Sequence, residues 1–197
     1  MHLVVGLGNP GRQHENDRHN VGFMVLGALA RRAGPTGFPA FKPKFSGEWT
    51  RGELAGHPVT LLAPQTYMNL SGDCVQPAAA FLKVDAANIV VVHDELDLPW
   101  RDVRLKVGGG HAGHNGLRSI IQRLGTPDFV RVRVGIGRPR SVAGEGPRDA
   151  TRQFVLSSFD PLERAELPDV VERAADAVMR VVSDGTATAM NAVNARR

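Results

Sequence analysis

In residues 88–96, "NIVVVHDEL", a run of apolar residues is followed at once by polar ones. A continuous run of β-branched residues without polar alternation is typical of a strand buried on both faces, as in the centre of a parallel sheet. The polar residues, beginning with His93 and Asp94, come only at the carboxyl end. The stretch therefore predicts a central parallel strand whose carboxyl end presents polar side chains.

Strands and helices are expected to alternate on both sides of this central strand. The residue patterns predict strands over 2–8, 103–107 and 129–139, a hairpin over 47–64 turning at 55–58, and helices over 19–33, 71–84, 115–125 and 186–197. Asp160, Pro161 and Glu163 indicate a helix start with a capping box, leading into one helix or a pair broken near Pro168. Residues 139–153 are expected to form a polar loop. The alternation predicts an α/β fold with a twisted, mostly parallel (mixed) sheet and helices on both faces.

Length and composition narrow the class of protein. The 197 residues fit a single domain, 1–197, and the formal charge of +4 permits an anionic partner without requiring one. The only cysteine, Cys74, excludes an internal disulfide and fits a reducing, cytoplasmic setting. No apolar stretch is long enough to span a bilayer, and the N-terminal apolar run is too short for a secretory signal. We expect a cytoplasmic protein without a membrane partner.

Gly6, Gly8 and Gly11 spell the G-x-G-x-x-G pattern of dinucleotide-binding proteins. That pattern requires the last glycine to open a helix whose N-terminus holds the pyrophosphate. Here Pro10 and a polar stretch follow instead, so we interpret "GLGNPG" as a tight turn that places Asn9 at the edge of the sheet. A dinucleotide-dependent oxidoreductase remains an alternative, which a test of NAD(P) binding would decide.

Polar residues recur where predicted strands end or helices begin. They are Asn9, His19–Asn20, Asn69, His93–Asp94 and His114–Asn115. Each one alone is readily explained as a turn or capping residue. Because ligands of open α/β sheets bind beyond the carboxyl ends of the strands, the set together predicts one crevice.

These residue types suit hydrolysis by activated water. A neutral imidazole such as His19 can accept a proton from water, and a carboxylate such as Asp94 fixes its tautomer and stabilises the imidazolium. Asparagine amides can hold a water, a carbonyl or an oxyanion. The sequence has no G-x-S-x-G elbow, while Ser71 and Cys74 fall at a predicted helix start and inside that helix. We therefore predict water attack on an acyl group.

A metal centre is the rival interpretation of this set. His93, Asp94, Glu95, Asp97, His111 and His114 are clustered in sequence. They show no recognised ligand spacing, and the glycine-containing "HAGH" would be a poor rigid chelate. We expect no metal.

Two predicted strands carry cations at alternate positions. Arg104 and Lys106 share one side of the first strand, and Arg131 and Arg133 share one side of the second. If the strands are neighbours, their four cations lie on one face, next to the flexible glycines 108–110, with Arg138 and Arg140 following. The pattern favours contact with nucleic-acid phosphate over a merely solvated sheet face. A non-catalytic RNA-binding module is a third alternative.

Six ordered blocks carry a resemblance to bacterial peptidyl-tRNA hydrolase: "VGLGNPG", "RHNVGF", "TYMNLSG", "HDELDLP", "RLKVGGGHAGHNGLRSI" and "RVRVGIGRP". The resemblance implies an enzyme without metal or cofactor that cleaves the ester between a peptide and the 3′ end of tRNA. It implies His19 as catalytic base and Asp94 as its partner. It further implies that Asn9, Asn69 and Asn115 contact the substrate or position the attacking water. Substrate contacts are also expected for His114, Tyr67 and His14, and tRNA phosphate contacts for Lys106 and Arg133. A monomer is expected.

The chain departs from the family's usual pattern near the expected base. His14 stands where the family commonly has Tyr, and Asp17 stands where it commonly has Thr. Asp17 could raise the pKa of His19 as a second carboxylate or could point to solvent, and the sequence leaves both open. Arg101 replaces a usual glycine, and the loop "SVAGEGPRDATR" is longer than usual.

Overall fold

The computed structural model describes residues 1–32, 37–139 and 146–195. The strands are β1 His2–Gly6, β2 Lys42–Lys44, β3 Gly47–Leu54, β4 His57–Pro64, β5 Ile89–Glu95, β6 Val103–Val107 and β7 Val130–Gly135. The α-helices are α1 Val21–Arg32, α2 Ser71–Leu82, α3 Asn115–Leu124, α4 Pro147–Val155, α5 Pro161–Asp184 and α6 Thr186–Asn194. Short 3-10 turns are η1 Arg12–His14, η2 Arg18–Asn20, η3 Met68–Leu70 and η4 Ala86–Asn88.

The strands form one 7-stranded mixed sheet in the order β2-β3-β4-β1-β5-β7-β6. The central strands β4, β1, β5 and β7 run parallel, and β3, β2 and β6 add antiparallel edges. The stretch 88–96 is thus confirmed as a central parallel strand, paired with β1 on one side and β7 on the other. The predicted α/β architecture is confirmed.

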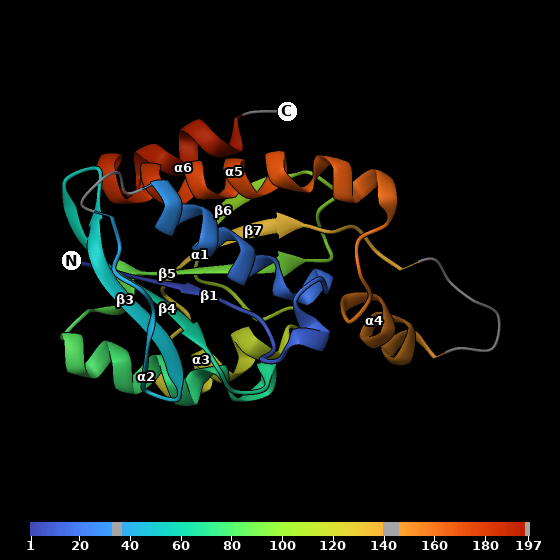
Figure 1. Cartoon of the computed structure of the whole chain (residues 1–197), viewed down its shortest axis with the longest axis horizontal. Coiled ribbons are helices and arrows are strands. Elements are labelled where there is room, and N and C mark those ends of the chain that lie inside the picture. Colours follow the sequence, from blue (N-terminus) through green and yellow to red (C-terminus); the bar gives the residue numbers. More distant parts are fainter. Residues whose placement is uncertain (33–36, 140–145, 196–197) are drawn as a thin grey trace.

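Helices cover both faces of the sheet (Figure 1). Alternating residues of β5 explain the two layers: Val90 and Val92 pack into the core shared with α1 and α5, whereas Ile89 and Val91 pack into the core shared with α2 and α3. All four are fully buried. A strand with apolar residues on both sides is therefore needed at this position.

A close crossing of α1 over β1 explains part of the glycine pattern. A Cβ at Gly6 would lie 2.3 Å from the carbonyl oxygen of Gly22, a separation that side chains never adopt. After Gly11 the chain forms two 3-10 turns, and the first α-helix begins only at Val21. The helix start that a dinucleotide fingerprint requires is thus missing directly after these glycines.

Four local expectations need correction or refinement. The predicted loop 139–153 is wrong from Pro147 on, where α4 begins; this helix ends at the buried Val155, while 140–145 lie outside the described residues. The short strand β2 lies in a stretch that had shown only proline and glycine signals. His19 belongs to the turn η2 rather than to α1, and α5 is one continuous helix with Pro168 inside it.

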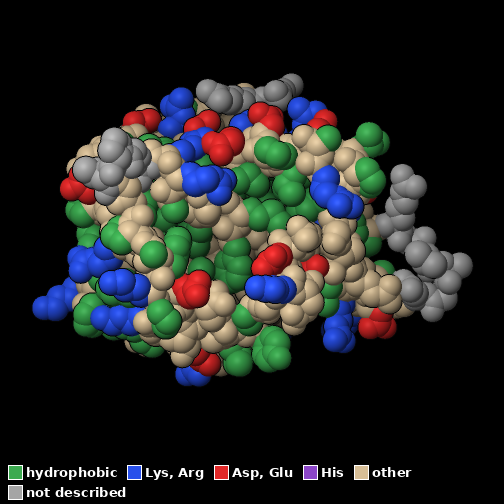
Figure 2. Space-filling model, in the orientation of Figure 1, with side chains coloured by type: hydrophobic (Ala, Val, Ile, Leu, Met, Phe, Trp, Pro, Cys, Tyr) green, Lys and Arg blue, Asp and Glu red, His purple; other side chains and the backbone are tan. Residues whose placement is uncertain are grey.

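The surface is mixed in charge on the face shown in Figure 2. Basic and acidic side chains lie near one another there, with several Lys and Arg side chains together at the lower left, over the β2–β3 hairpin. Lys42 and Arg51 of this hairpin are exposed. No helix within the described ranges is long and apolar enough to cross a membrane.

Candidate active site

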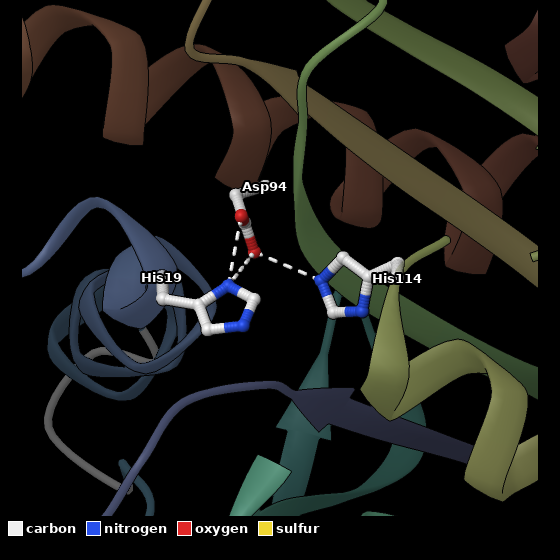
Figure 3. Close-up of side chains that lie close together, drawn as sticks. All are labelled: His19, Asp94 and His114. Carbon is white, nitrogen blue, oxygen red and sulfur yellow. Dashed lines mark hydrogen bonds and ion pairs between the residues drawn. The ribbon is translucent and has the colours of Figure 1, made fainter. Parts of the chain in front are cut away.

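Three polar side chains from distant parts of the chain meet at one end of the sheet. Asp94 lies near the carboxyl end of β5, His19 lies in the turn before α1, and His114 directly precedes α3 (Figure 3). The three side chains are only 10%, 1% and 10% exposed for His19, Asp94 and His114 respectively. The structure thus brings together three of the residues for which the sequence predicted one crevice.

The Asp94 carboxylate holds both imidazole rings. His19 Nδ1 lies 2.9 Å from Oδ1 and 2.8 Å from Oδ2 of Asp94. His114 Nε2 lies 2.9 Å from the same Oδ1. The ring centres of His19 and His114 are 5.0 Å apart, so the two rings approach the carboxylate from different sides.

The start of α3 fixes the tautomer of His114. His114 is the N-cap residue, and its Nδ1 accepts hydrogen bonds from the backbone N–H groups of Gly116 at 3.1 Å and Leu117 at 3.4 Å. Because Nδ1 uses its lone pair there, the neutral ring carries its proton on Nε2. His114 therefore donates to Asp94.

The same logic gives the tautomer of His19. An ionised carboxylate only accepts hydrogen bonds, so His19 Nδ1 must carry a proton and donate it to Asp94. In the neutral ring the other nitrogen, Nε2, keeps its lone pair. This is the arrangement in which a histidine serves as a general base with its tautomer fixed by a carboxylate.

Burial and pairing act in opposite directions on these groups. Burial works against the charged form of Asp94, but the charges and hydrogen bonds of His19 and His114 outweigh it and hold the pKa of Asp94 well below its usual range. Burial also disfavours a charged His19, but Asp94, by charge and hydrogen bond, and then the charge of Asp17 raise the pKa of His19 above its ordinary value of 6.5. The pair thus favours an ionised Asp94.

Asn9 is held firmly beside this cluster. Its backbone N–H donates to Asn20 Oδ1 and its carbonyl accepts from Asn20 Nδ2, both at 2.9 Å. Its side-chain Oδ1 accepts from the N–H of Met68, also at 2.9 Å. The Asn9 amide is thereby oriented, with its Nδ2 donors left out of these contacts.

Three other predicted substrate residues lie at the surface. Asn69 follows Met68 in η3, and Asn115 follows His114 at the start of α3; both are exposed. Tyr67 is 69% exposed. Within the described ranges, the side chains of Asn69 and Asn115 make no hydrogen bond to the protein, so their amides are available to a ligand.

The structure resolves the question that Asp17 had posed. Asp17 is 5% exposed and points inward, and its Oδ2 lies 2.6 Å from Nδ1 of His14. The two residues that depart from the usual family pattern therefore bond to each other. Asp17 contributes to the raised pKa of His19 through its charge, whereas His14 is engaged with Asp17.

The described residues contain one group whose potential ligand atoms lie close enough together to hold a metal ion: His19, Asp94 and His114. Only Asp94 and His114 belong to the ligand set considered from the sequence. Nδ1 of His19 and Nε2 of His114 carry protons directed at Asp94, and Nδ1 of His114 caps a helix. A metal ion would have to break these hydrogen bonds, so the donor set fits a hydrogen-bonded cluster better than a metal centre.

His93 is a buried neighbour of both Asp94 and His114. It is 1% exposed, and its Nδ1 donates to the carbonyl oxygen of Asp94 at 2.8 Å. Its ring packs edge-on against His114, with centres 5.1 Å apart. Burial, followed by the charge of His114, lowers the pKa of His93 to about 3, which keeps the ring neutral.

Comparison with known proteins decides the family. A sequence profile described as "Peptidyl-tRNA hydrolase" matches residues 3–197. The chain belongs to the peptidyl-tRNA hydrolase family. It is therefore an enzyme, and the family supports hydrolysis of peptidyl-tRNA.

Individual members of the peptidyl-tRNA hydrolase family match along the whole chain. The peptidyl-tRNA hydrolase of Sorangium cellulosum (strain So ce56) is 54% identical over 198 residues, covering 100% of this chain and 85% of the relative. That of Rhodococcus opacus (strain B4) is 53% identical over 189 residues, covering 96% and 95%. The crystal structure of peptidyl-tRNA hydrolase from Acinetobacter baumannii has a TM-score of 0.88 and 38% identity, covering 99% of this chain and 95% of that chain.

The cationic strands of this peptidyl-tRNA hydrolase family member are indeed neighbours. In the antiparallel β6–β7 pair, Arg104 lies opposite Arg133 and Lys106 lies opposite Arg131. Arg133 donates to Glu95 at 2.8 Å, while Arg104 donates to Asp102 at 3.1 Å. These ion pairs reduce the free positive charge of the face.

Arg131 departs from the expected phosphate-facing role. It is 2% exposed, and its guanidinium donates to the carbonyl oxygens of Gly109 and Gly110, both at 2.6 Å. Lys106 is exposed and, within the described ranges, makes no ion pair. Arg138 pairs with Asp97, and Arg140 lies outside the described residues.

Sequence reasoning missed Arg18, the residue just before the predicted base. A charged residue beside a helix start is usually solvated. Nothing in the local sequence indicates that Arg18 is buried, with only 6% of its surface exposed. Its partners lie far away in the chain, in and after α4. Since α4 had been predicted as loop, its contacts with Arg18 could not be foreseen.

Proposed function

We propose that this chain hydrolyses the ester bond between the peptide and the 3′ end of tRNA in peptidyl-tRNA, using water activated by His19 with Asp94 as its partner. The observation that carries the proposal is the hydrogen bonding of His19, whose Nδ1 is committed to Asp94. Nε2 is then the basic atom of the ring, as a general base requires.

The chemical step can be written with all atoms in place. Water attacks the ester carbonyl carbon while His19 Nε2 takes one of its protons, and the carbonyl becomes an oxyanion. The tetrahedral intermediate collapses with cleavage of the carbon–oxygen bond to the tRNA ribose, and His19 returns the proton to that ribose oxygen. The products are a free peptide and a tRNA with its hydroxyl restored. Asp94 stabilises the transient imidazolium.

The asparagines supply neutral donors around the reacting group. Asn9 is oriented by Asn20 and Met68, so its Nδ2 donors are preorganised for an oxyanion or for the attacking water. Asn69 and Asn115 offer exposed side-chain amides to the substrate. Tyr67, His14 and His114 complete the proposed substrate contacts.

The proposed tRNA contacts lie on the strands β6 and β7. Lys106 is exposed, and Arg133 can exchange Glu95 for a phosphate. The chain is proposed to act as a monomer. We further propose that the reaction needs neither metal nor cofactor and takes place in the cytoplasm, where peptidyl-tRNA arises in translation.

The deciding assay measures release of free peptide from peptidyl-tRNA by the wild type and by His19→Ala, each with a chelator present. The wild type should remain active and the variant should lose about 10²- to 10⁴-fold in kcat, the contribution of a general base. Equal tRNA affinity of the two proteins would show that the variant is folded. Unchanged turnover in His19→Ala would refute the assignment of the base, and loss of wild-type activity with the chelator would refute the metal-free mechanism.

A further inference from the structure

Arg18, one residue before His19, is enclosed almost completely by protein. Its Nη1 lies 2.6 Å from a carboxylate oxygen of Glu163, and its Nε donates to Ser157 Oγ at 3.3 Å. The guanidinium carbon also lies 4.5 Å from the ring centre of Phe154 and 5.1 Å from that of Phe159. All these partners belong to residues 154–163, the junction between α4 and α5, which we call the α4–α5 junction.

The backbone makes the same connection. The N–H of Arg18 donates to the carbonyl oxygen of Ser157 at 3.0 Å, and Asp17 and Ser158 form an isolated antiparallel bridge. The turn η2, which carries His19, is thus attached to the α4–α5 junction by main chain and side chain together.

The anchor on the junction is itself rigid. Asp160 and Glu163 form the predicted capping box at the start of α5, with both hydrogen bonds at 2.8 Å. The Glu163 oxygen that accepts from the Asp160 N–H is the oxygen that pairs with Arg18. The position of Arg18 is therefore tied to the first turn of a helix that packs on the sheet.

The opposite side of the turn has its own anchor. Asn20 is bonded to the backbone of Asn9 through both ends of its amide. His19 therefore lies between two fixed neighbours, and its ring is oriented by hydrogen bonds to the Asp94 carboxylate. Burying a guanidinium is costly unless it is paired, so a fold that places one next to its proposed base indicates a demand for geometric precision there.

We propose that Arg18 is a positioning residue of the reaction: by locking the turn η2 into the α4–α5 junction, it sets where the His19 imidazole lies relative to Asp94 and the substrate. This inference rests on the proposed function, because it assumes that His19 is the base. It makes α4 and the start of α5 part of the support of the site, although neither contributes a reacting group.

Arg32 offers a matched control at the other end of α1. It also joins α1 to α5, donating to the side chain and carbonyl oxygen of Glu172 and pairing with Asp176 at 2.7 Å. Lysine at either position keeps the charge but loses the planar fork that makes several hydrogen bonds and stacks on rings. Both substitutions weaken arginine contacts with acidic residues of α5, one made from η2 next to His19 and the other made from the far end of α1.

The test compares Arg18→Lys with Arg32→Lys in steady-state peptide release. Arg18→Lys should lower kcat by about 10-fold or more with KM within about twofold, since a misplacement on the order of 1 Å can cost 10²-fold. Arg32→Lys should keep kcat within about twofold even if its Tm falls as much as that of Arg18→Lys. Equal kcat values for the two variants, or a loss confined to KM, would overturn the proposal.

A second variant and a second readout keep the test decisive if Arg18→Lys folds poorly. Glu163→Gln retains the capping box, which accepts Gln as well as Glu, but removes the anion that pairs with Arg18, so it should also lower kcat. The ¹H NMR signal of the His19 Nδ1 proton should shift or broaden in Arg18→Lys and Glu163→Gln and stay in place in Arg32→Lys. An unchanged signal would contradict positioning by Arg18.

The NMR readout also separates the two proposals. It reports the orientation of the His19 ring without any turnover. If the signal moves but His19→Ala still hydrolyses peptidyl-tRNA, Arg18 positions His19 and the proposed function is wrong. If His19→Ala is inactive but the signal is the same in all Arg18 variants, the proposed function stands and the role of Arg18 falls.

Discussion

The polar cluster at the end of β5 and the cationic strands β6 and β7 differ in how their charged groups are paired and buried. At the carboxyl end of β5, His19, Asp94 and His114 are nearly buried and hold one another through hydrogen bonds of 2.8–2.9 Å. On β6 and β7, by contrast, Arg133 and Arg104 are paired with nearby acids that remain partly open to solvent. The first region is closed and prearranged, and the second is held in exchangeable ion pairs.

The difference follows from what each region is proposed to do. A general base must be oriented before the substrate arrives, because reorganisation during the reaction adds to the barrier. A phosphate contact needs only a cation that can change partner at low cost, which a partly exposed ion pair provides. Substitutions in the two regions should therefore act on different kinetic constants.

The largest effect expected in this comparison comes from Asp94→Asn. The asparagine lacks the charge that stabilises the imidazolium and can present an N–H to His19, which disfavours the required tautomer. We expect kcat to fall by about 10²-fold or more with tRNA affinity unchanged. Loss of the carboxylate also removes the main cause of the raised pKa of His19, so the acidic limb of the kcat/KM profile should move to lower pH.

The sign of that shift is a strict check. Activity requires neutral His19, so it rises with pH through the pKa of His19 and reaches a plateau above it. A lower pKa in Asp94→Asn brings the plateau to lower pH, although the plateau itself is reduced. A limb that stayed in place or moved to higher pH would contradict the pairing as the cause.

Arg133→Ala should have a moderate effect on the other region. If Arg133 contacts a tRNA phosphate, KM should rise by about 5-fold with kcat nearly unchanged, and the slope of log affinity against log salt should fall by about one. Arg51→Ala is the matched control: Arg51 is an exposed arginine on β3, near the opposite edge of the sheet. If both variants lost affinity equally, only net charge would matter and the β6–β7 contact would be wrong.

The smallest effect is expected for Asp17→Asn. Asp17 adds to the raised pKa of His19 by its charge, and it ranks after Asp94 among the causes. The acidic limb should therefore move to lower pH by less than in Asp94→Asn, with kcat on the plateau within about twofold. Asp176→Asn on α5, which pairs with Arg32 at the far end of α1, should leave the limb in place. A limb unaffected by Asp17→Asn would mean that Asp94 alone sets the pKa.

Much of the fold could be predicted because the signals were local. The apolar run of β5 predicted a strand buried on both faces, and the pair Asp160 and Glu163 indicated the start of α5. The short strand β2 was missed because its three residues are held by pairing with β3 rather than by their own pattern. The polar helix α4 was missed because what stabilises it, including the contact of Phe154 with Arg18, is tertiary.

The sequence indicated which candidate residues gather at one edge of the sheet, but not the hydrogen bonds that connect them. Asn9 and Asp94 follow strands whose carboxyl ends must share an edge, so their gathering could be inferred from topology. The alternation on β7 suggested that Arg131 faces outward, yet the glycine loop folds over it and its guanidinium binds that loop. The tautomer of His114 likewise depends on how α3 begins in three dimensions.

The most direct test of the central claim is a ¹⁵N NMR titration of His19 in the free enzyme, compared with the pH profile of kcat/KM from about pH 5 to about pH 9. If His19 is the base, both measurements should give the same pKa, above 6.5, and the neutral ring should be protonated on Nδ1 and unprotonated on Nε2. A neutral ring protonated on Nε2, or a kinetic pKa that differs from that of His19, would contradict it.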